Sequence, residues 1–421
     1  IKTYNLELVM VEDLIKSPFY PSKIEDLPTV NGINLITGYS HIKELGPDVG
    51  IVVFDNLSSV AGVFTNSEMA SAPVAWCRSI IQEGKAKALI VNSGNANAFT
   101  GNQGSKNVIA KTAALAKAIK CRADEIFVAS TGVIGEQLPI QNILDKIPDL
   151  IKGLRKNDWL NLAQSIRTTD TYPKLGSLKF TIDEDEFVLN GVAKGSGMIN
   201  PNMGTLLGFF FTDACIPANI LSYYLNEINS KTFNAITVDG DTSTSDTILL
   251  FSTGNENSHK KISDVNDPRL DNFISVLNRL MKDLAHQVIK DGEGVSKFIT
   301  ITVENAITRD SARKIANKIA NSPLVKTAIA GEDPNWGRII MAIGNAKQKI
   351  DKNKLKIYFG EILIAENGSV SESYCENQAA IYMKNNEILI RVDLGLGSEE
   401  FTAWTCDFTK QYIQINSDYR S

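Results

Sequence analysis

The 421-residue sequence has few of the residues that build the commonest metal and redox sites. It contains three histidines and five cysteines, and no two cysteines form a C-x-x-C pair. These shortages argue against a zinc ribbon, a redox dithiol and an imidazole-based metal site, and the scattered cysteines favour a reducing compartment. We therefore expect a protein that uses neither a metal nor another bound cofactor.

Charge and hydropathy exclude two further classes of function. The 43 Lys and Arg against 48 Asp and Glu give a net charge of −5, which provides no basic stripe for DNA or RNA. No apolar run approaches the roughly 20 residues that span a bilayer, and the N-terminal sequence has acids where a signal peptide is basic. We expect no nucleic-acid partner, no membrane partner and a cytoplasmic location, with any removed leader left open.

Short β-branched stretches and amphipathic helices alternate along the chain, without a strict βαβ rhythm. This pattern favours an α+β fold built from α/β sandwich layers, and the length suggests two or three domains. Helices are expected at 107–119, after a glycine-rich turn at 101–104, and at 268–290, where Asp267 is the N-cap. Strands are expected at 50–54, 60–64, 88–92, 298–303 and 388–392.

Glycine, asparagine and threonine are concentrated in a few polar segments. Such segments provide backbone N–H groups and hydroxyls for close approach to a small ligand, although each one alone is equally well explained as a surface turn. The segments are 92–101, 130–139, 168–173, 193–214 and 238–247, followed by shorter ones at 291–294 and 331–338.

Three familiar chemistries fit these segments poorly. A phosphate-binding P-loop has its lysine after the glycines, whereas Lys194 precedes Gly195 and Gly197, and the dinucleotide pattern G-x-G-x-x-G also fails. No histidine stands beside a G-x-S-x-G elbow, which disfavours a serine-hydrolase triad. Asp239 and Asp241 could bind Mg²⁺, but carboxylates in such a turn more often make local hydrogen bonds.

The pair Gly204-Thr205, which precedes an apolar run, offers a different chemistry. An N-terminal threonine can use its own α-amine, with a pKa of about 7.7–8.0, as the base for its hydroxyl. Self-cleavage would create this terminus: the Thr205 hydroxyl attacks the Gly204 carbonyl, and water hydrolyses the resulting ester. Gly204 lacks a Cβ and leaves its carbonyl accessible. The same pair is also an ordinary way to begin a strand, so spacing alone does not establish this chemistry.

Taken together and in order, the polar segments resemble the ornithine acetyltransferase family, also called glutamate N-acetyltransferase. The resemblance implies an N-terminal-nucleophile-like fold and a precursor that cuts itself between Gly204 and Thr205. The products would be an α chain, 1–204, and a β chain, 205–421, which share an active site, stay together as α₂β₂ and include a smaller C-terminal α/β domain from about residue 295 to 421. The matching motifs are NSGNANAFTG, STGVIGE-x-LP, TTDTYPK, AKGSGMI-x-PNM-x-T, DGDTSTSDT, DGEG, VKTAIAGEDPNWGR and INSDYRS.

The resemblance also implies a reaction in arginine biosynthesis. An acetyl group moves from N2-acetylornithine to glutamate through an acetyl ester on Thr205, in ping-pong order, and some members of the family also accept acetyl-CoA as a co-substrate. Thr131 and Gly132 match the pair that stabilises the oxyanion. The positions that match substrate contacts are Thr168, Lys194, Thr205, Glu293, Asn416 and Ser421.

The sequence departs from the family pattern at three positions. Gly204 and Asn200 stand where alanine is common, and Phe99 where cysteine is frequent. The change at Gly204 bears on the efficiency of self-cleavage more than on its chemistry. Two alternatives stay open: a related amidase or peptidase that uses water as the acceptor, and an uncleaved protein that only binds a small ligand.

Overall fold

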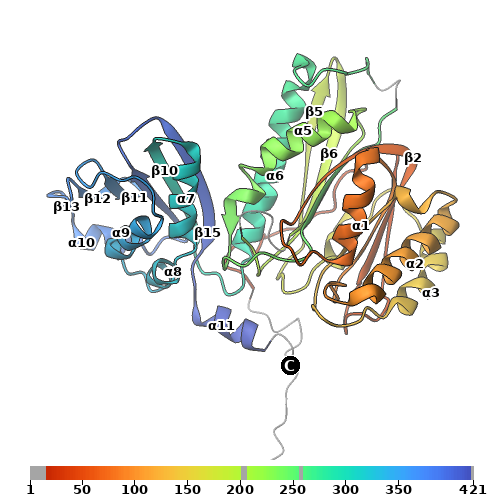
Figure 1. Ribbon diagram of the computed structural model, residues 1–421, viewed down its shortest axis with the longest axis horizontal. Coiled ribbons are helices and arrows are strands. Elements are labelled where there is room, and N and C mark those ends of the chain that lie inside the picture. Colours follow the sequence, from red (N-terminus) through yellow and green to blue (C-terminus); the bar gives the residue numbers. More distant parts are fainter. Residues whose placement is uncertain (1–15, 201–205, 256–258, 419–421) are drawn as a thin grey trace, which may run out of the picture. The chain divides into compact units, whose positions relative to one another are not determined.

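The computed structural model describes residues 16–200, 206–255 and 259–418, which form two compact units (Figure 1). The larger unit contains residues 22–234 and 241–288. The smaller unit contains residues 235–240 and 289–421, together with the stretch that ends at Pro21. Each unit has its own sheet, and the two are described separately below.

The described residues of the larger unit form an eight-stranded mixed sheet with the order β4-β3-β2-β9-β7-β6-β5, and β1 pairs with β2 at the side. The β3–β4 and β7–β9 pairs are parallel, and the other pairs are antiparallel. The strands are β1 (Ile33–Gly38), β2 (Val49–Phe64), β3 (Lys85–Asn92), β4 (Ile126–Ser130), β5 (Lys174–Ile182), β6 (Asp185–Lys194), β7 (Leu207–Thr212) and β9 (Thr247–Ser252).

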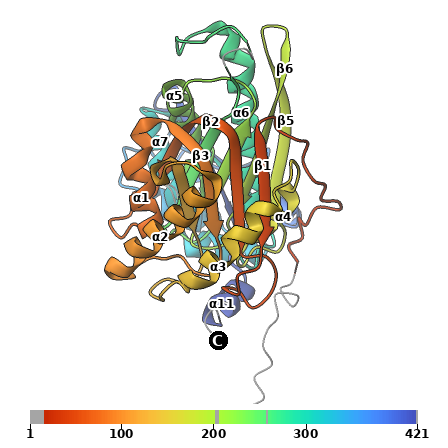
Figure 2. The same ribbon diagram turned by 90° about the vertical axis from the view of Figure 1, so that its right-hand side faces the viewer.

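Helices cover both faces of this sheet (Figures 1 and 2). Alternation along β7 separates the faces, because Phe209 and Phe211 join the core that contains Trp159, whereas Phe210 packs against Phe233. The helices on the Trp159 side are α1 (Ala72–Ile80), α2 (Gly101–Ile119), α3 (Ile140–Lys152) and α4 (Trp159–Ser165). Those on the other side are α5 (Ala218–Asn229) and α6 (Asp271–Lys290).

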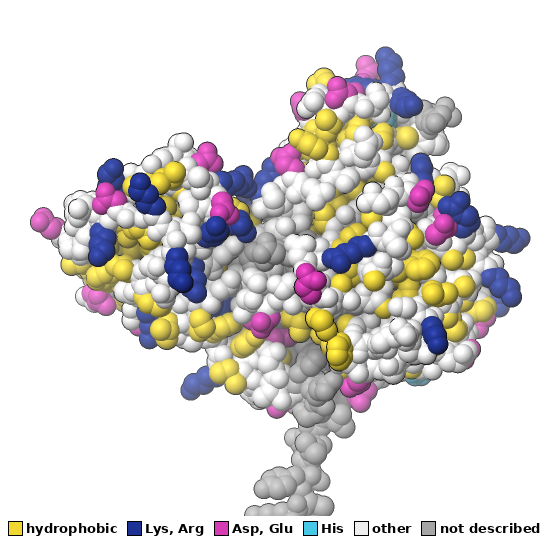
Figure 3. All heavy atoms as spheres, viewed as in Figure 1, with side chains coloured by type: hydrophobic (Ala, Val, Ile, Leu, Met, Phe, Trp, Pro, Cys, Tyr) yellow, Lys and Arg dark blue, Asp and Glu magenta, His cyan; other side chains and the backbone are white. Residues whose placement is uncertain are grey.

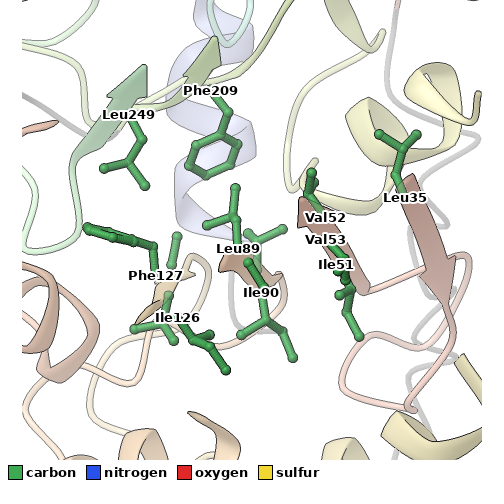
Figure 4. Packing of buried hydrophobic residues seen from close by; sticks show 14 of the residues in the cluster. Leu35, Ile51, Val52, Val53, Leu89, Ile90, Ile126, Phe127, Phe209 and Leu249 are labelled. Carbon is green, nitrogen blue, oxygen red and sulfur yellow. The ribbon is translucent and has the colours of Figure 1, made fainter. Parts of the chain in front are cut away.

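Apolar side chains from seven strands meet in the main core of the larger unit, and Figure 4 shows part of it. Aromatic rings fill its centre: the rings of Phe211 and Phe251 stack with centroids 5.3 Å apart, and those of Phe54 and Trp159 lie against them. Such rings bury a large apolar area, which is the main stabilising contribution to a core of this kind. The core therefore fixes the strand ends that carry the polar segments.

The described residues of the smaller unit form a seven-stranded sheet with the order β13-β12-β11-β14-β10-β15-β8. Its strands are β8 (Ile236–Thr237), β10 (Phe298–Ala306), β11 (Lys356–Phe359), β12 (Ile362–Glu366), β13 (Ser369–Val370), β14 (Glu387–Asp393) and β15 (Glu399–Cys406). Its helices are α7 (Arg309–Ala320), α8 (Pro323–Ala330), α9 (Trp336–Asn345), α10 (Glu376–Tyr382) and α11 (Lys410–Ser417).

The predicted α+β fold is confirmed, because both sheets mix parallel and antiparallel pairs and carry helices on their faces. The predicted strands at 50–54 and 60–64 are two parts of one long strand, β2. The predicted cap is confirmed as well: the Asp267 carboxylate accepts a hydrogen bond from Arg269 N at 3.0 Å, and a 3-10 turn at Pro268–Leu270 precedes α6.

The predicted turn at 101–104 is wrong, because α2 already begins at Gly101. At Gly104 the glycine allows close packing instead of a turn. A Cβ there would lie 2.1 Å from the Thr100 hydroxyl oxygen and 3.0 Å from Asn97 Oδ1. Gly104 is thus accommodated in this helix because the side chains of Thr100 and Asn97 leave no room for a Cβ.

Charged side chains of both signs are interspersed with polar and hydrophobic ones on the face shown in Figure 3. They do not gather there by sign. Within residues 16–200, 206–255 and 259–418, no helix combines the length and the apolarity that crossing a membrane requires.

Candidate active site

The structure places the predicted site residues in three groups. Gly204, Thr205 and Ser421 lie outside the described residues. Thr131, Gly132, Thr168 and Lys194 belong to the larger unit, and Glu293 and Asn416 belong to the smaller one.

Thr131 and Gly132 follow directly after β4, where the chain leaves the sheet. Thr131 is 2% exposed, and its backbone N donates to Asn92 O at 3.0 Å, next to the β3–β4 pairing. Gly132 has a φ of +129°, and a Cβ there would lie 2.3 Å from the carbonyl carbon of Gly94 and 2.5 Å from Asn95 N. Only glycine fits this position without moving the backbone beside it.

The Asn92 side chain joins the ends of β3 and β4. Its Oδ1 accepts hydrogen bonds from Ser130 Oγ at 2.7 Å and from Lys111 Nζ at 3.0 Å, and its Nδ2 donates to Asn95 O at 3.0 Å. Because all four residues are buried, these bonds satisfy groups that water does not reach. The loop that carries Thr131 is therefore held by a buried polar network.

Lys111 was not predicted from the sequence as a functional residue. The helical spacing could have indicated it: Lys111 lies between Val108 and Leu115 on the apolar face of α2, where a side chain is buried.

Asp170 connects Thr168 to the loop after Lys194. It is fully buried; its Oδ1 accepts from Lys174 Nζ at 2.6 Å and from Gly195 N at 2.8 Å, and its Oδ2 accepts from Thr168 N at 3.1 Å. Burial by itself raises the pKa of this carboxyl, but the positive charges of Lys174 and Lys194 outweigh burial and hold the pKa below its ordinary value. Asp170 is thus an ionised anchor for two predicted substrate residues.

Lys43, which the sequence did not single out, contacts the neighbours of Gly132 on one side and of Thr168 on the other. Its Nζ donates to Arg167 O at 3.3 Å, and a Cβ on Gly94 would lie 2.9 Å from its Cγ. Burial lowers the pKa of Lys43 to about 8; Asp48 partly offsets this, and Lys194 adds to it. An amine with this pKa can bind an anion or exchange a proton near neutral pH.

Leu206 is the first described residue after Thr205, and Asp246 fixes its backbone. Leu206 N donates to Asp246 Oδ1 at 2.8 Å, and Thr247 N donates to Leu206 O at 3.0 Å. Asp246 Oδ2 is buried and has no hydrogen-bond partner among the described residues. Burial raises the pKa of Asp246 well above its ordinary value, although the Leu206 N–H and Lys194 act in the opposite direction. The polar segment 238–247 therefore holds the start of β7 through a carboxyl that favours the protonated form.

Glu293 and Asn416 lie together in the smaller unit. Asn416 Nδ2, in α11, donates to Glu293 Oε2 at 2.7 Å and to Tyr412 O at 3.0 Å. The hydroxyl of Thr409, the N-cap of α11, donates to Gly294 O at 2.7 Å, which ties the helix to the same DGEG segment. The helix is therefore positioned by the segment that carries Glu293, which is 6% exposed.

The chemistry of these groups is that of hydroxyls, backbone N–H donors, lysines and carboxylates. In the part of the chain that the structure describes, no three His, Cys, Asp or Glu side chains are grouped so as to hold a metal ion. Lysine and glutamate side chains recognise the carboxylate and the ammonium of an amino acid, while hydroxyl and N–H donors suit a developing oxyanion.

Replacing Gly132 by alanine should distort the Thr131 loop. We expect G132A to lower the free energy of unfolding by about 2–4 kcal/mol, because its Cβ overlaps the Gly94–Asn95 peptide. Gly135 is the matched control, since it also has a positive φ of +86° but has open space around a Cβ, so G135A should cost about 1 kcal/mol. Urea unfolding of the two variants measures the difference, and equal losses would contradict the steric argument.

Replacing Asp170 by asparagine should reveal its ionised state. The folded-state pKa of Asp170 is lowered, so its stabilisation is present above the ordinary carboxyl pKa of about 3.9 and is lost as the pH falls through the folded-state value. We expect D170N to lose about 3–5 kcal/mol near neutral pH, because Lys174 is left buried without its anion. The difference in the free energy of unfolding between D170N and the unsubstituted protein should become smaller in acid.

Urea unfolding as a function of pH measures this gap. The control is D149N, which breaks an exposed pair with Lys152 and should change little. A pH-independent gap for D170N would contradict the ionised assignment.

Comparison with known proteins identifies the family. A family model described as "ArgJ family" matches residues 35–421. The arginine biosynthesis bifunctional protein ArgJ of Bartonella henselae is 47% identical over 96% of this chain and 99% of its own length, and that of Bradyrhizobium diazoefficiens is 48% identical with the same coverage. The crystal structure of the ArgJ protein of Bacillus halodurans is 36% identical and covers 49% of this chain and 96% of its own, with a TM-score of 0.47. A match to the family model over nearly the whole chain, with relatives this similar along their full length, makes this chain a member of the ArgJ family.

Proposed function

We propose that this protein is an acetyltransferase of arginine biosynthesis that moves the acetyl group of N2-acetylornithine to glutamate. The observation that carries the proposal is the match to the ArgJ family over residues 35–421, a range that contains every residue assigned a role below. The relatives that are nearly half identical over their full length are named as arginine biosynthesis proteins, which supports the same pathway for this chain.

The nucleophile in this proposal is Thr205, exposed by self-cleavage. The Thr205 hydroxyl oxygen attacks the Gly204 carbonyl carbon, the Gly204–Thr205 C–N bond breaks, and an ester joins the two residues. Water then hydrolyses the ester and leaves a carboxylate on Gly204 and a free amine on Thr205. Support comes from the next residue, since Asp246 and Thr247 hold both backbone polar groups of Leu206 and so fix the chain directly after the nucleophile.

Acetyl transfer then takes place in two half-reactions. The Thr205 amine takes the proton of the Thr205 hydroxyl, whose oxygen attacks the acetyl carbonyl; ornithine leaves with that proton, and the acetyl group remains as an ester on Thr205. The α-amine of glutamate attacks this ester and restores the hydroxyl. In both half-reactions the Thr131 hydroxyl and the Gly132 N–H donate hydrogen bonds to the oxygen that becomes negative.

The family resemblance assigns the substrate contacts. Lys194 binds the α-carboxylate that donor and acceptor share. Thr168 is linked to the Lys194 end of β6 by Asp170, which accepts hydrogen bonds from Thr168 N and Gly195 N. Glu293 binds an amino group, and its hydrogen bond with Asn416 supports a common role for these two residues. Ser421 completes the set. A cytoplasmic location and an α₂β₂ assembly of the cleaved chains belong to the same proposal.

Mass spectrometry of the purified protein tests self-cleavage. We expect two chains that separate between Gly204 and Thr205 in the unsubstituted protein and in T205S, which keeps a hydroxyl, and one intact chain in T205A. An intact chain in all three proteins would favour the alternative of an uncleaved binding protein. Release of acetate without glutamate by the cleaved enzyme would instead favour an amidase, and replacing N2-acetylornithine with acetyl-CoA tests the second acetyl donor.

Steady-state kinetics of T131A test the oxyanion assignment. We expect kcat to fall about 10²–10³-fold, because one hydrogen bond that forms in the transition state is lost. T112A is the matched control: the Thr112 hydroxyl is also buried in the larger unit, but it donates only to carbonyls of its own helix, and kcat should stay near the unsubstituted value. Full turnover by T131A would refute the role of this hydroxyl.

A further inference from the structure

Lys111 is a fully buried lysine whose ammonium pairs with no carboxylate among the described residues. Among the described residues two other lysines are equally buried, and each has either an anionic partner or more hydrogen bonds. Lys174 forms an ion pair with Asp170, and Lys326 donates to the Thr405 hydroxyl at 2.7 Å and to a backbone carbonyl. Lys111 Nζ makes one hydrogen bond, to the amide oxygen of Asn92. Burying an ammonium with so little compensation is costly, so this position requires an explanation.

The surroundings of Lys111 bring its ionisation close to neutral pH. Burial lowers the pKa of Lys111 to about 8, and Cys77 of α1 is the titratable group that acts on it, in the opposite direction. Burial raises the pKa of the Cys77 thiol to about 12, and this thiol bonds with the Val128 backbone. Near neutral pH the Cys77 thiol is therefore protonated, and its effect on Lys111 appears only where the thiolate forms.

Asn92 connects Lys111 to the Thr131 loop. The same Asn92 Oδ1 that binds Lys111 accepts from Ser130 Oγ, and the backbone oxygen of Asn92 accepts from Thr131 N. Gly132 packs directly on the Gly94–Asn95 peptide, and Asn92 Nδ2 donates to the next carbonyl oxygen, that of Asn95. The ammonium is thus linked through Asn92 to the loop that carries Thr131 and Gly132, to which the proposed function assigns stabilisation of the oxyanion. In a poorly solvated interior a charge acts on another charge far more strongly than it does in water.

We infer that Lys111 is a positioning residue for the Thr131–Gly132 loop, and that its positive charge, acting through Asn92, favours the negative charge that develops there during acetyl transfer. This inference rests on the proposed acetyltransferase function. It makes the transfer rate depend on the proton of Lys111, which passes to solvent at alkaline pH. The Thr205 amine acts in the opposite direction, because it is a base only after losing its own proton, near about pH 7.7–8.0. The rate therefore passes through a maximum as the pH rises.

The experiment compares K111M and K111Q with the unsubstituted enzyme, after mass spectrometry has confirmed that each is cleaved. Acetyl transfer from N2-acetylornithine to glutamate is followed from about pH 6 to about pH 10. We expect kcat of both variants to be about tenfold lower near neutral pH, with KM little changed, and the alkaline fall in rate to disappear. K111Q keeps an N–H donor for Asn92 but has no charge, so a lower kcat in this variant reports on the loss of the charge.

K326M is the matched control, because it removes an equally buried lysine from the smaller unit. It should lose stability and still show the alkaline fall. Variants of Lys111 that keep the unsubstituted kcat and the alkaline fall would overturn the inference, whereas an unsubstituted enzyme that transfers no acetyl group would refute the proposed function itself.

One measurement needs no variant. The titration of Lys111 Nζ, followed by NMR on nitrogen-labelled lysine in the unsubstituted enzyme, should coincide with the alkaline fall in kcat. A rate that does not fall where Lys111 loses its proton would overturn the inference even if both variants failed to fold.

Discussion

The parallel pairing of β3 with β4 places two polar strand ends side by side, and the larger unit is organised around this pairing. The register matches Asn92 with Ser130, so the segments that begin after these residues leave the sheet together. The core of packed aromatic rings below keeps the two strands from moving apart. Because the ends are buried, their polar groups must bond with one another, and the Asn92 side chain satisfies most of this need. The loop that follows β4 is thus held by hydrogen bonds to the end of β3.

Two buried aspartates of the larger unit, Asp170 and Asp246, differ in protonation because their surroundings differ. Asp170 lies between lysines and accepts three hydrogen bonds, so it stays ionised. Asp246 accepts from Leu206 N, but burial dominates, so this carboxyl favours the neutral form. The two carboxyl groups thus differ in charge because their neighbours differ, although both are buried.

The sequence predicted the parts of the molecule that depend on local patterns. The β-branched stretch at 298–303 became β10, and Asp267 caps the helix that its neighbours suggested. Gly104 misled because glycine marks close packing as well as turns, and only the contacts with Thr100 and Asn97 distinguish the two. Lys43 and Lys111 were missed for a related reason: a lysine is ordinarily exposed, and the groups that surround these two come from distant parts of the chain. The bond between Glu293 and Asn416 joins residues 123 positions apart, which no local pattern reports.

The position of β7 in its sheet decides what a cut before Leu206 would do to the molecule. This strand pairs on one side with β6, from the part of the chain before the cut, and on the other with β9, from the part after it, while β9 pairs in turn with β2. After hydrolysis of that bond, two polypeptides would contribute strands to one continuously hydrogen-bonded sheet. Separating them would require breaking the hydrogen bonds in the middle of that sheet and exposing its aromatic core. The two fragments should therefore denature as one cooperative body, and differently labelled molecules should not exchange fragments while they remain folded.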